Sequence, residues 1–475
     1  MSLTYADVLT FVQNLTPTWV KPQQAMLSHV LCALAERPSL CLSELARALP
    51  DGPHAQGAQS LHGRLKRLNR FLDNPRLDEP ALFWRWYRLA LHFGSEIAEA
   101  PALLPILLDT TYFEPFAALI ASVPCGGRAL PIAFTTYQRR SLQACFPPAA
   151  GWPTPDRLLA SPARRQHQPL HAASSEVCAW ASQNHIEEQL LHYLWSFIAL
   201  DAQHVVVVAD RGFARASLFR WFLTLQRQFA IRFDGDTWLY LPDGRSGAAQ
   251  HVLALRPGEQ RWLAHAHYGQ TDRVPVAVLA LWEPGQQEPW YIATNLTDAQ
   301  VTATCYRWRM RIEAGNRDEK TGVILREGGD HHQLTALRHL HRLVLAICCL
   351  HWLAALVGLQ AYHDLAAPQT LAPALETVPP DCPDLTLLDH GPALPPPTCP
   401  HRRPEATPPA WLRRFTARGP LSYVRLGMEV LRDHHYGPLV RRAVRWLGLY
   451  LWITTPLWSP KQLRYRRIHW WPIPY

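Results

Sequence analysis

The chain has 475 residues, of which 48% are hydrophobic and 18% are charged. This balance excludes a fibrous repeat, a disulfide-rich miniprotein and a wholly disordered chain, and the length predicts roughly two to four domains. Forty-seven basic residues against thirty-eight acidic ones leave a net charge of +9, which favours an anionic partner such as nucleic acid. Only four of the basic residues are lysines, and an arginine-rich genome produces the same positive excess.

The cysteines and the apolar segments indicate in which cellular compartment the chain is expected. None of the ten cysteines forms a CxxC pair, so we expect buried thiols in a reduced, cytoplasmic chain without a zinc knuckle. No charged-then-apolar signal sequence opens the chain. Residues 343–359 are apolar enough to raise the question of a membrane helix, but they contain His351 and lack a second span of similar length. We therefore expect a buried core helix and no membrane partner.

Residues 1–98 are expected to form a helical domain. Helical spacing of apolar residues over 22–35 is followed by a short helix over 42–49 and a basic helix over 60–72. If this unit is a helix-turn-helix, the basic helix enters the major groove and Arg64, Lys66 and Arg67 contact DNA. A helical bundle with one solvated basic face fits the same pattern, and both interpretations stay open.

Residues 99–362 alternate between strands and helices, which predicts one α/β domain. The expected strands span residues 103–109, 116–123, 129–136, 204–209 and 229–233, with helices over 186–200 and 218–226. Four consecutive valines predict that the strand over 204–209 is fully buried. The order of elements matches the ribonuclease H-like fold, a mixed sheet flanked by helices.

The second half of the chain adds an insertion and a tail. Residues 234–300 alternate in polarity and carry tryptophans between Gly and Pro turns, which predicts a small antiparallel β insertion. Helical segments are expected over 298–320 and 334–360. Residues 363–410 are dense in proline and are expected to form a linker. Residues 411–475 form a basic, aromatic C-terminal region, for which DNA contact, a dimer interface and a folded cap all stay open.

Three carboxylates lie where this order of elements can bring them together. Asp109 ends the first predicted strand, Asp210 ends the valine strand, and Glu313 lies on the helix after the insertion. The first and fourth strands of a ribonuclease H-like sheet are neighbours, so acids at their ends can converge. Oxygen ligands suit Mg²⁺, with Mn²⁺ as the alternative, and two such ions promote in-line displacement at phosphorus. Taken alone, Asp109 fits an ordinary strand-end turn residue better than a metal ligand, whereas a charge directly after buried valines is costly unless it is used.

A second pattern surrounds Glu313. Tyr306, Arg309, Glu313 and Lys320 are spaced at 0, 3, 7 and 14 residues and fall within an arc of about 60° on one helix face. A carboxylate on this face can hold a metal ion while Arg309 and Lys320 bind neighbouring phosphates. Tyr306, Arg309 and Lys320 are therefore candidate DNA contacts. The alternative is a solvated face with ion pairs at helical spacing, although lysine is too rare in this chain for the pattern to be common by chance.

On these residues the chain resembles a cut-and-paste DDE transposase of the insertion-sequence-four family. The resemblance spans about residues 100–345 and rests on Asp109-Thr110, Asp210-Arg211-Gly212-Phe213 and the Tyr306/Arg309/Glu313/Lys320 pattern. It implies a ribonuclease H-like catalytic core in which an antiparallel insertion separates the second Asp from the Glu. It also implies that Asp109, Asp210 and Glu313 are the catalytic metal ligands.

The resemblance implies a function as well. Such a transposase would cleave transposon ends and join them to target DNA by two-metal-ion phosphoryl transfer, as a homodimer on double-stranded DNA at the bacterial nucleoid. A tryptophan of the insertion would hold a flipped base; Trp238 and Trp262 are the candidates, and each also fits a core position. The alternatives are a ribonuclease H-like metal-dependent DNA nuclease without strand transfer and a catalytically dead DNA-binding descendant, against which the three intact acids argue.

Overall fold

A single mixed sheet of twelve strands organises the chain, in the order β5-β4-β3-β2-β1-β6-β7-β12-β11-β10-β8-β9. The computed structural model describes residues 4–51, 60–93, 103–125, 128–146, 176–179, 182–198, 204–320, 334, 336–366, 423–432 and 437–454. The strands are β1 (Leu104–Phe113), β2 (Phe116–Cys125), β3 (Arg128–Gln138), β4 (Gln143–Phe146), β5 (Glu176–Ala179), β6 (Val205–Ala209), β7 (Gln228–Phe233), β8 (Trp238–Tyr240), β9 (Ser246–Ala248), β10 (Gln260–Tyr268), β11 (Val274–Leu281) and β12 (Trp290–Thr294).

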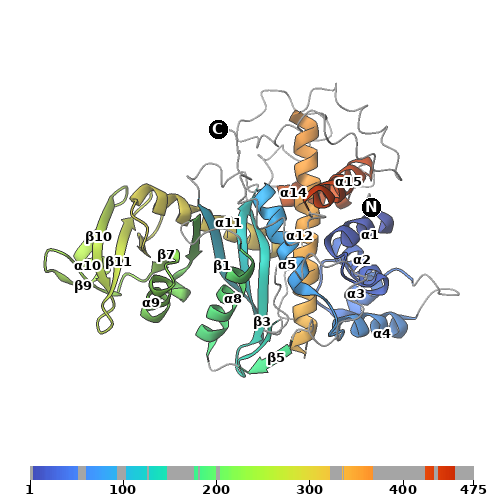
Figure 1. Ribbon diagram of the computed structural model, residues 1–475, viewed down its shortest axis with the longest axis horizontal. Coiled ribbons are helices and arrows are strands. Elements are labelled where there is room, and N and C mark those ends of the chain that lie inside the picture. Colours follow the sequence, from blue (N-terminus) through green and yellow to red (C-terminus); the bar gives the residue numbers. More distant parts are fainter. Residues whose placement is uncertain are drawn as a thin grey trace, which may run out of the picture.

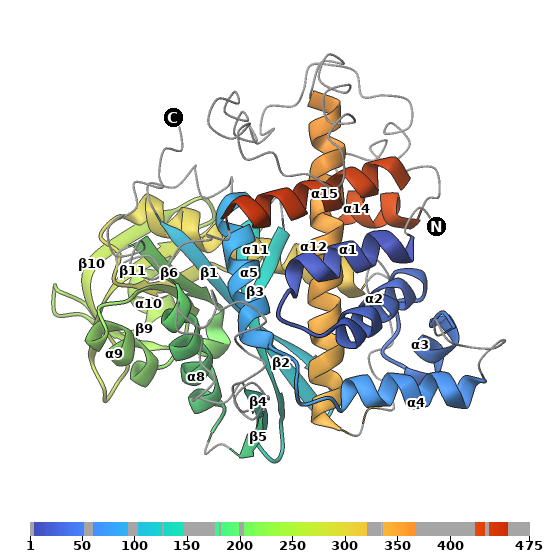
Figure 2. The ribbon, with the colours of Figure 1, turned by 45° about the vertical axis from the view of Figure 1, so that its right-hand side comes forward.

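Helices surround this sheet. They are α1 (Tyr5–Leu15), α2 (Lys21–Glu36), α3 (Leu42–Ala48), α4 (Leu61–Leu72), α5 (Glu79–Phe93), α8 (Gln183–Phe197), α9 (Ala216–Thr224), α10 (Ala249–Leu253), α11 (Ala299–Lys320), α12 (Leu337–Ala366), α14 (Tyr423–Arg432) and α15 (Gly437–Thr454), with a 3-10 turn at Arg211–Phe213. The long helix α12 passes between the sheet and helices α1–α4, whereas α5 lies against the sheet (Figures 1 and 2).

The centre of the sheet has the predicted ribonuclease H-like arrangement. Strands β1, β2 and β3 form an antiparallel meander, β6 pairs in parallel with β1, and β7 pairs in parallel with β6. All five residues of β6 are at most 1% exposed, because the strand has a neighbour on each edge and helices over both faces. The fold class predicted from the order of elements is therefore confirmed.

The β insertion is not a separate sheet. Its strands pair antiparallel as predicted, but β12 also pairs with β7, with Ala293 opposite Ile231. The insertion therefore continues the central sheet toward β9 at its far edge (Figure 1). The short elements β4, β5, β9 and α10 were not expected from the sequence, because each is too short to show a hydrophobic period.

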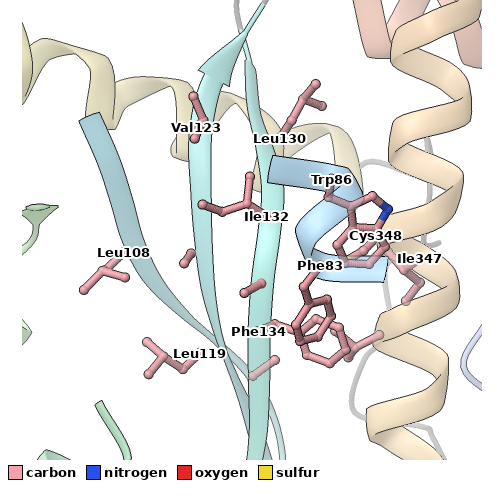
Figure 3. Packing of buried hydrophobic residues seen from close by; sticks show 14 of the residues in the cluster. Phe83, Trp86, Leu108, Leu119, Val123, Leu130, Ile132, Phe134, Ile347 and Cys348 are labelled. Carbon is pink, nitrogen blue, oxygen red and sulfur yellow. The ribbon is translucent and has the colours of Figure 1, made fainter. Parts of the chain in front are cut away.

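Successive residues of the central strands point to opposite faces of the sheet and pack into two different hydrophobic cores. Leu107 and Val208 belong to a core beneath α11, together with Ile312 of that helix. The residues next to them, such as Leu108, belong to a larger core with α5, α8, α9 and α12. Figure 3 shows Phe83 of α5 and Ile347 of α12 on this side of the sheet. Each fully buried large side chain stabilises the fold by roughly 1.5–3 kcal/mol.

Helix α12 is a core helix, as its sequence predicts. Among the described helices it is the one long and apolar enough to cross a membrane, but 89% of its apolar stretch is buried inside the protein. Helix α12 also carries two buried polar side chains, His341 and Arg342. Arg342 pairs with Glu79 at the start of α5, and Nε2 of His341 lies 3.0 Å from the same carboxylate. Because all three side chains are at most 1% exposed, the pairing fixes α5 against α12.

The described part of the C-terminal region is a folded cap. A Cβ atom on Gly427 would lie 1.7 Å from the carbonyl oxygen of Ala354, so the absence of a side chain lets α14 touch the backbone of α12. Helix α15 lies beside α1, where Gly448 faces Asn14. The predicted linker over 363–410 lies outside the described residues except for its first four positions, which end α12.

Candidate active site

Asp109 and Asp210 lie on the same face of neighbouring strands. The register of β1 and β6 sets Leu107 opposite Val208; Asp109 follows Leu107 by two residues within β1, and Asp210 follows Val208 by two residues, directly after the end of β6. Side chains two apart in a strand share a face, so both acids lie on the face where Leu107 and Val208 pack beneath α11. Asp109 lies inside β1 rather than at its end, because β1 continues as an antiparallel partner of β2 as far as Phe113.

Arg309 of α11 lies between the two carboxylates. Its Nη2 atom is 3.8 Å from Oδ1 of Asp109 and 3.3 Å from Oδ2 of Asp210. Those two oxygens are therefore separated by no more than the sum of the two distances, about 7 Å. The side chain of Arg309 is 10% exposed, whereas those of Asp109 and Asp210 are 16% and 35% exposed. The acids therefore meet at a half-buried position that solvent reaches from the Asp210 side.

The turn after β6 fixes the second acid. Asp210 caps the 3-10 turn at Arg211–Phe213, and its Oδ1 accepts a hydrogen bond of 3.0 Å from the backbone amide of Gly212. A Cβ atom at Gly212 would lie 3.1 Å from the same oxygen, which is tighter than ordinary contact. Glycine at this position therefore lets the backbone approach the carboxylate and leaves Oδ2 directed toward Arg309.

Tyr306 anchors the helix that carries Arg309. It is 1% exposed, and its ring meets Trp290 of β12 edge to face at 5.1 Å. Burial raises the pKa of the Tyr306 phenol, while the positive charges of Arg309 and Arg232 oppose that rise. Tyr306 thus lies near Asp210 but is not accessible to a DNA phosphate in this conformation, in contrast to the contact expected from the sequence.

A chain of ion pairs begins at Arg211, the residue after Asp210. Arg211 lies 3.1 Å from Asp234 and 4.0 Å from Glu288, and Glu288 also pairs with Arg232. Most of these side chains are more than half exposed, so each pair contributes little to stability on its own. They place both signs of charge next to Asp210.

The remaining members of the helical pattern are placed only by their backbone. Helix α11 is continuous from Ala299 to Lys320, so Glu313 follows Arg309 by one helical turn. The side chains of Glu313 and Lys320 lie outside the described ones. Among the side chains that are described, no group of three or more His, Cys, Asp or Glu could hold a metal ion. The two acids at Arg309 nevertheless suit a hard divalent cation, because they offer carboxylate oxygens with an approach from solvent.

Of the three DNA contacts predicted in the N-terminal domain, Arg64 and Arg67 bind other parts of the protein, and Lys66 faces solvent. Arg64 pairs with Asp51 at 2.8 Å and donates to the carbonyl oxygen of Arg47, and Arg67 donates to that of Pro50. Both arginines therefore tie α4 to the end of α3, while Lys66 is exposed. Twelve residues separate α3 from α4, whereas a helix-turn-helix has a turn of about three to four. The arrangement resembles the helical bundle more closely.

The two candidate tryptophans differ in exposure. Trp238 on β8 is 36% exposed and is available for stacking. Trp262 on β10 lies opposite Leu279 and packs against the core beneath α11. The structure thus separates a surface tryptophan from a packing one.

A known protein family matches the segment of the chain that contains Asp210 and α11. Residues 184–353 match the family model described as the transposase DDE domain. The chain thus carries a segment similar to a transposase DDE domain. The match supports a transposase role; it begins at α8 and includes Asp210, Arg309 and Glu313, whereas Asp109 precedes it. No curated protein matches the chain.

Sequence patterns did not reveal the contact between Arg309 and the two aspartates. The helical spacing placed Arg309 beside Glu313 on one face, but it gave no sign that the same side chain reaches β1 and β6. The neighbours Arg232 and Trp290 were also missed, since each lies in a strand whose pattern indicates packing alone. Only the pairing of β12 with β7 brings them next to Tyr306.

Proposed function

We propose that this chain is a DNA transposase of the insertion-sequence-four family, which cleaves transposon ends and joins them to target DNA. The observation that carries the proposal is the meeting of Asp109 and Asp210, 101 residues apart, on one arginine of α11. That helix lies within the segment that matches the transposase DDE domain. Two acids and an arginine gathered from three separate elements are costly to bury unless the site is used.

Asp109, Asp210 and Glu313 are proposed to hold the divalent ions, Mg²⁺ or Mn²⁺. When bound, such ions activate the attacking hydroxyl and stabilise the leaving oxygen of an in-line displacement. An upper limit of about 7 Å between the two aspartate oxygens is compatible with a pair of ions about 3.5–4 Å apart. Glu313 would approach the same position from α11, one turn after Arg309.

The remaining residues are proposed to hold the nucleic acid. Lys320 and Arg309 would bind phosphates, Trp238 would stack on an unpaired base, and Lys66 would follow the backbone of the duplex. The net charge of +9 favours this double-stranded DNA partner, and a falling affinity with rising salt is expected. Two transposon ends must be cut together, so a homodimer on DNA is part of the proposal.

Joining of ends to new DNA tests this proposal. A donor plasmid carries the coding region with its flanking genomic DNA, a second plasmid is the target, and the purified protein is added with Mg²⁺. The expected products are a cut donor and a target plasmid that has gained the donor segment, both lost in Asp109→Asn. Cutting without joining would support a ribonuclease H-like nuclease instead, and DNA binding without either product would support a catalytically dead descendant.

A further inference from the structure

We infer that Arg309 is a built-in competitor of the divalent ion: its guanidinium holds Asp109 and Asp210 together in the metal-free protein and must give up these contacts when an ion binds. The inference rests on the proposed function, because it concerns the same acids. It assigns Arg309 a role toward the metal in addition to the phosphate contact expected from the sequence.

The hydrogen bonds of Asp210 show which oxygen is contested. Its Oδ1 accepts from the amide of Gly212 at 3.0 Å and is held within the turn. Its Oδ2 is therefore the oxygen directed out of the turn, and this is the atom that Arg309 approaches at 3.3 Å. An ion that binds Asp210 on this side must use the oxygen that the guanidinium already occupies.

Charge makes the two occupants exclude one another. A Mg²⁺ ion lies about 2.1 Å from its carboxylate oxygen, so it would come within about 5.4 Å of the Arg309 nitrogen, which lies 3.3 Å from the same atom. Positive charges at that separation repel each other, and the repulsion is only partly screened because the Arg309 side chain is 10% exposed. Arg309 must therefore move away, or the ion binds more weakly than the two acids alone would allow.

Burial explains why the arginine is there. The Arg309 side chain is 10% exposed, and a charge in such a position is unfavourable unless it is paired. Without it, two neighbouring carboxylates on adjacent strands would repel each other across the sheet. A DNA phosphate, which the proposed reaction supplies, can replace the two acids as the partner of the displaced arginine. Metal binding and DNA binding would then favour one another.

Binding of Mn²⁺ to the full chain without DNA, measured by isothermal titration calorimetry, tests the inference. Arg309→Gln should bind Mn²⁺ about tenfold more tightly than the wild type. Arg309→Lys keeps a positive charge and should bind as the wild type does. Arg307→Gln is the matched control, because Arg307 lies on the same helix but is 42% exposed and pairs with Glu283. Its Mn²⁺ affinity should not change.

Thermal melting gives the second measurement. Without metal, Arg309→Gln should melt below the wild type, and saturating Mn²⁺ should raise its melting temperature more than that of the wild type. If the variant folds only when Mn²⁺ is present, the ion has replaced the missing positive charge, as inferred. Unchanged or weaker Mn²⁺ binding in Arg309→Gln, while Asp210→Asn abolishes binding, would overturn the inference alone. Wild-type Mn²⁺ binding in Asp210→Asn would overturn the proposed metal site together with it.

Discussion

The rings of Trp290 and Tyr306 meet edge to face, with their centroids 5.1 Å apart, and this contact joins the last strand of the insertion to α11. Both side chains are at most 6% exposed. Because Arg309 follows Tyr306 by less than one helical turn, the ring contact fixes where the arginine meets the acids of β1 and β6. The last strand of the insertion therefore helps to set the position of α11, and with it that of Arg309, over the two acids.

Substitution of Tyr306 separates a packing role from a DNA contact. Tyr306→Phe keeps the ring and should leave DNA affinity unchanged, because a phenol that is 1% exposed cannot reach a phosphate. Tyr306→Ala should lower the free energy of unfolding by about 3–5 kcal/mol, as expected for the loss of a large buried ring. Fluorescence anisotropy with a labelled DNA end and chemical denaturation measure the two effects. Weaker DNA binding by a stably folded Tyr306→Phe would restore the contact expected from the sequence.

Glu313→Gln tests the third proposed ligand. The change keeps the size of the side chain but removes the charge that would hold an ion, so strand cleavage should fall by more than about a hundredfold, while DNA binding stays near that of the wild type. Gel assays of cleavage and binding on the same DNA measure both. Glu319→Gln is the control, since residue 319 lies about 240° around α11 from residue 313. Equal losses in the two variants would show that Glu313 has no special role.

The two tryptophans of the insertion should respond differently to removal. Trp238→Ala should weaken binding to DNA with an unpaired base by about 1–3 kcal/mol, the usual contribution of base stacking, and should leave the melting temperature nearly unchanged. Trp262→Ala should lower the melting temperature instead, because Trp262 packs against the core beneath α11. A DNA end with 2-aminopurine at the unpaired position reports the stacking by fluorescence. A Trp238→Ala protein that quenches this fluorescence as the wild type does would contradict the stacking role.

His29 predicts a pH dependence of stability. His29 is 6% exposed and stacks on the ring of Tyr5. Burial lowers the pKa of its imidazole from 6.5 to about 4, and the positive charge of Arg67 contributes a smaller part of this decrease. Between these values the unfolded chain takes up a proton that the folded chain does not. The free energy of unfolding should therefore fall as the pH falls below 6.5, by up to about 3 kcal/mol near pH 4.

Other groups also titrate in this range, so the comparison is with His29→Gln. The difference in unfolding free energy between the two proteins should be constant above pH 6.5 and should shift in favour of the variant below it. A difference that stays constant down to pH 4 would mean that His29 is protonated equally in the folded and unfolded chains.

Much of the fold follows from local pattern. The valine strand and helix α11 were predicted within one residue, and α12 was predicted to end six residues too early, because each is long or apolar enough to show its period but not its last turns. The order of these elements was enough for the ribonuclease H-like class. The continuity of the insertion with the central sheet was not predictable, since nothing within β12 indicates that it pairs with β7 rather than closing a separate sheet.

The candidate site shows the same division. A charge after buried valines marked Asp210, and helical spacing joined Arg309 to Glu313. The position of the Arg309 guanidinium between the two acids depends on how α11 crosses the sheet. That crossing is set by the tertiary packing of Tyr306 against Trp290, which no local pattern shows. Arg64 and Arg67 had the charge and spacing of DNA contacts, yet their hydrogen bonds to α3 and its following turn come from a fold that helical periodicity alone does not describe.

Iron-directed cleavage of the protein tests the central claim, that Asp109, Asp210 and Glu313 share a divalent ion. Fe²⁺ takes the place of Mg²⁺ at carboxylate sites, and with ascorbate and peroxide it cuts the backbone close to where it is bound. Mass spectrometry of the fragments should show cuts near residues 109, 210 and 313, which excess Mg²⁺ suppresses and Asp210→Asn removes. Cuts at only one of these segments, or cuts that persist in Asp210→Asn, would contradict a shared site.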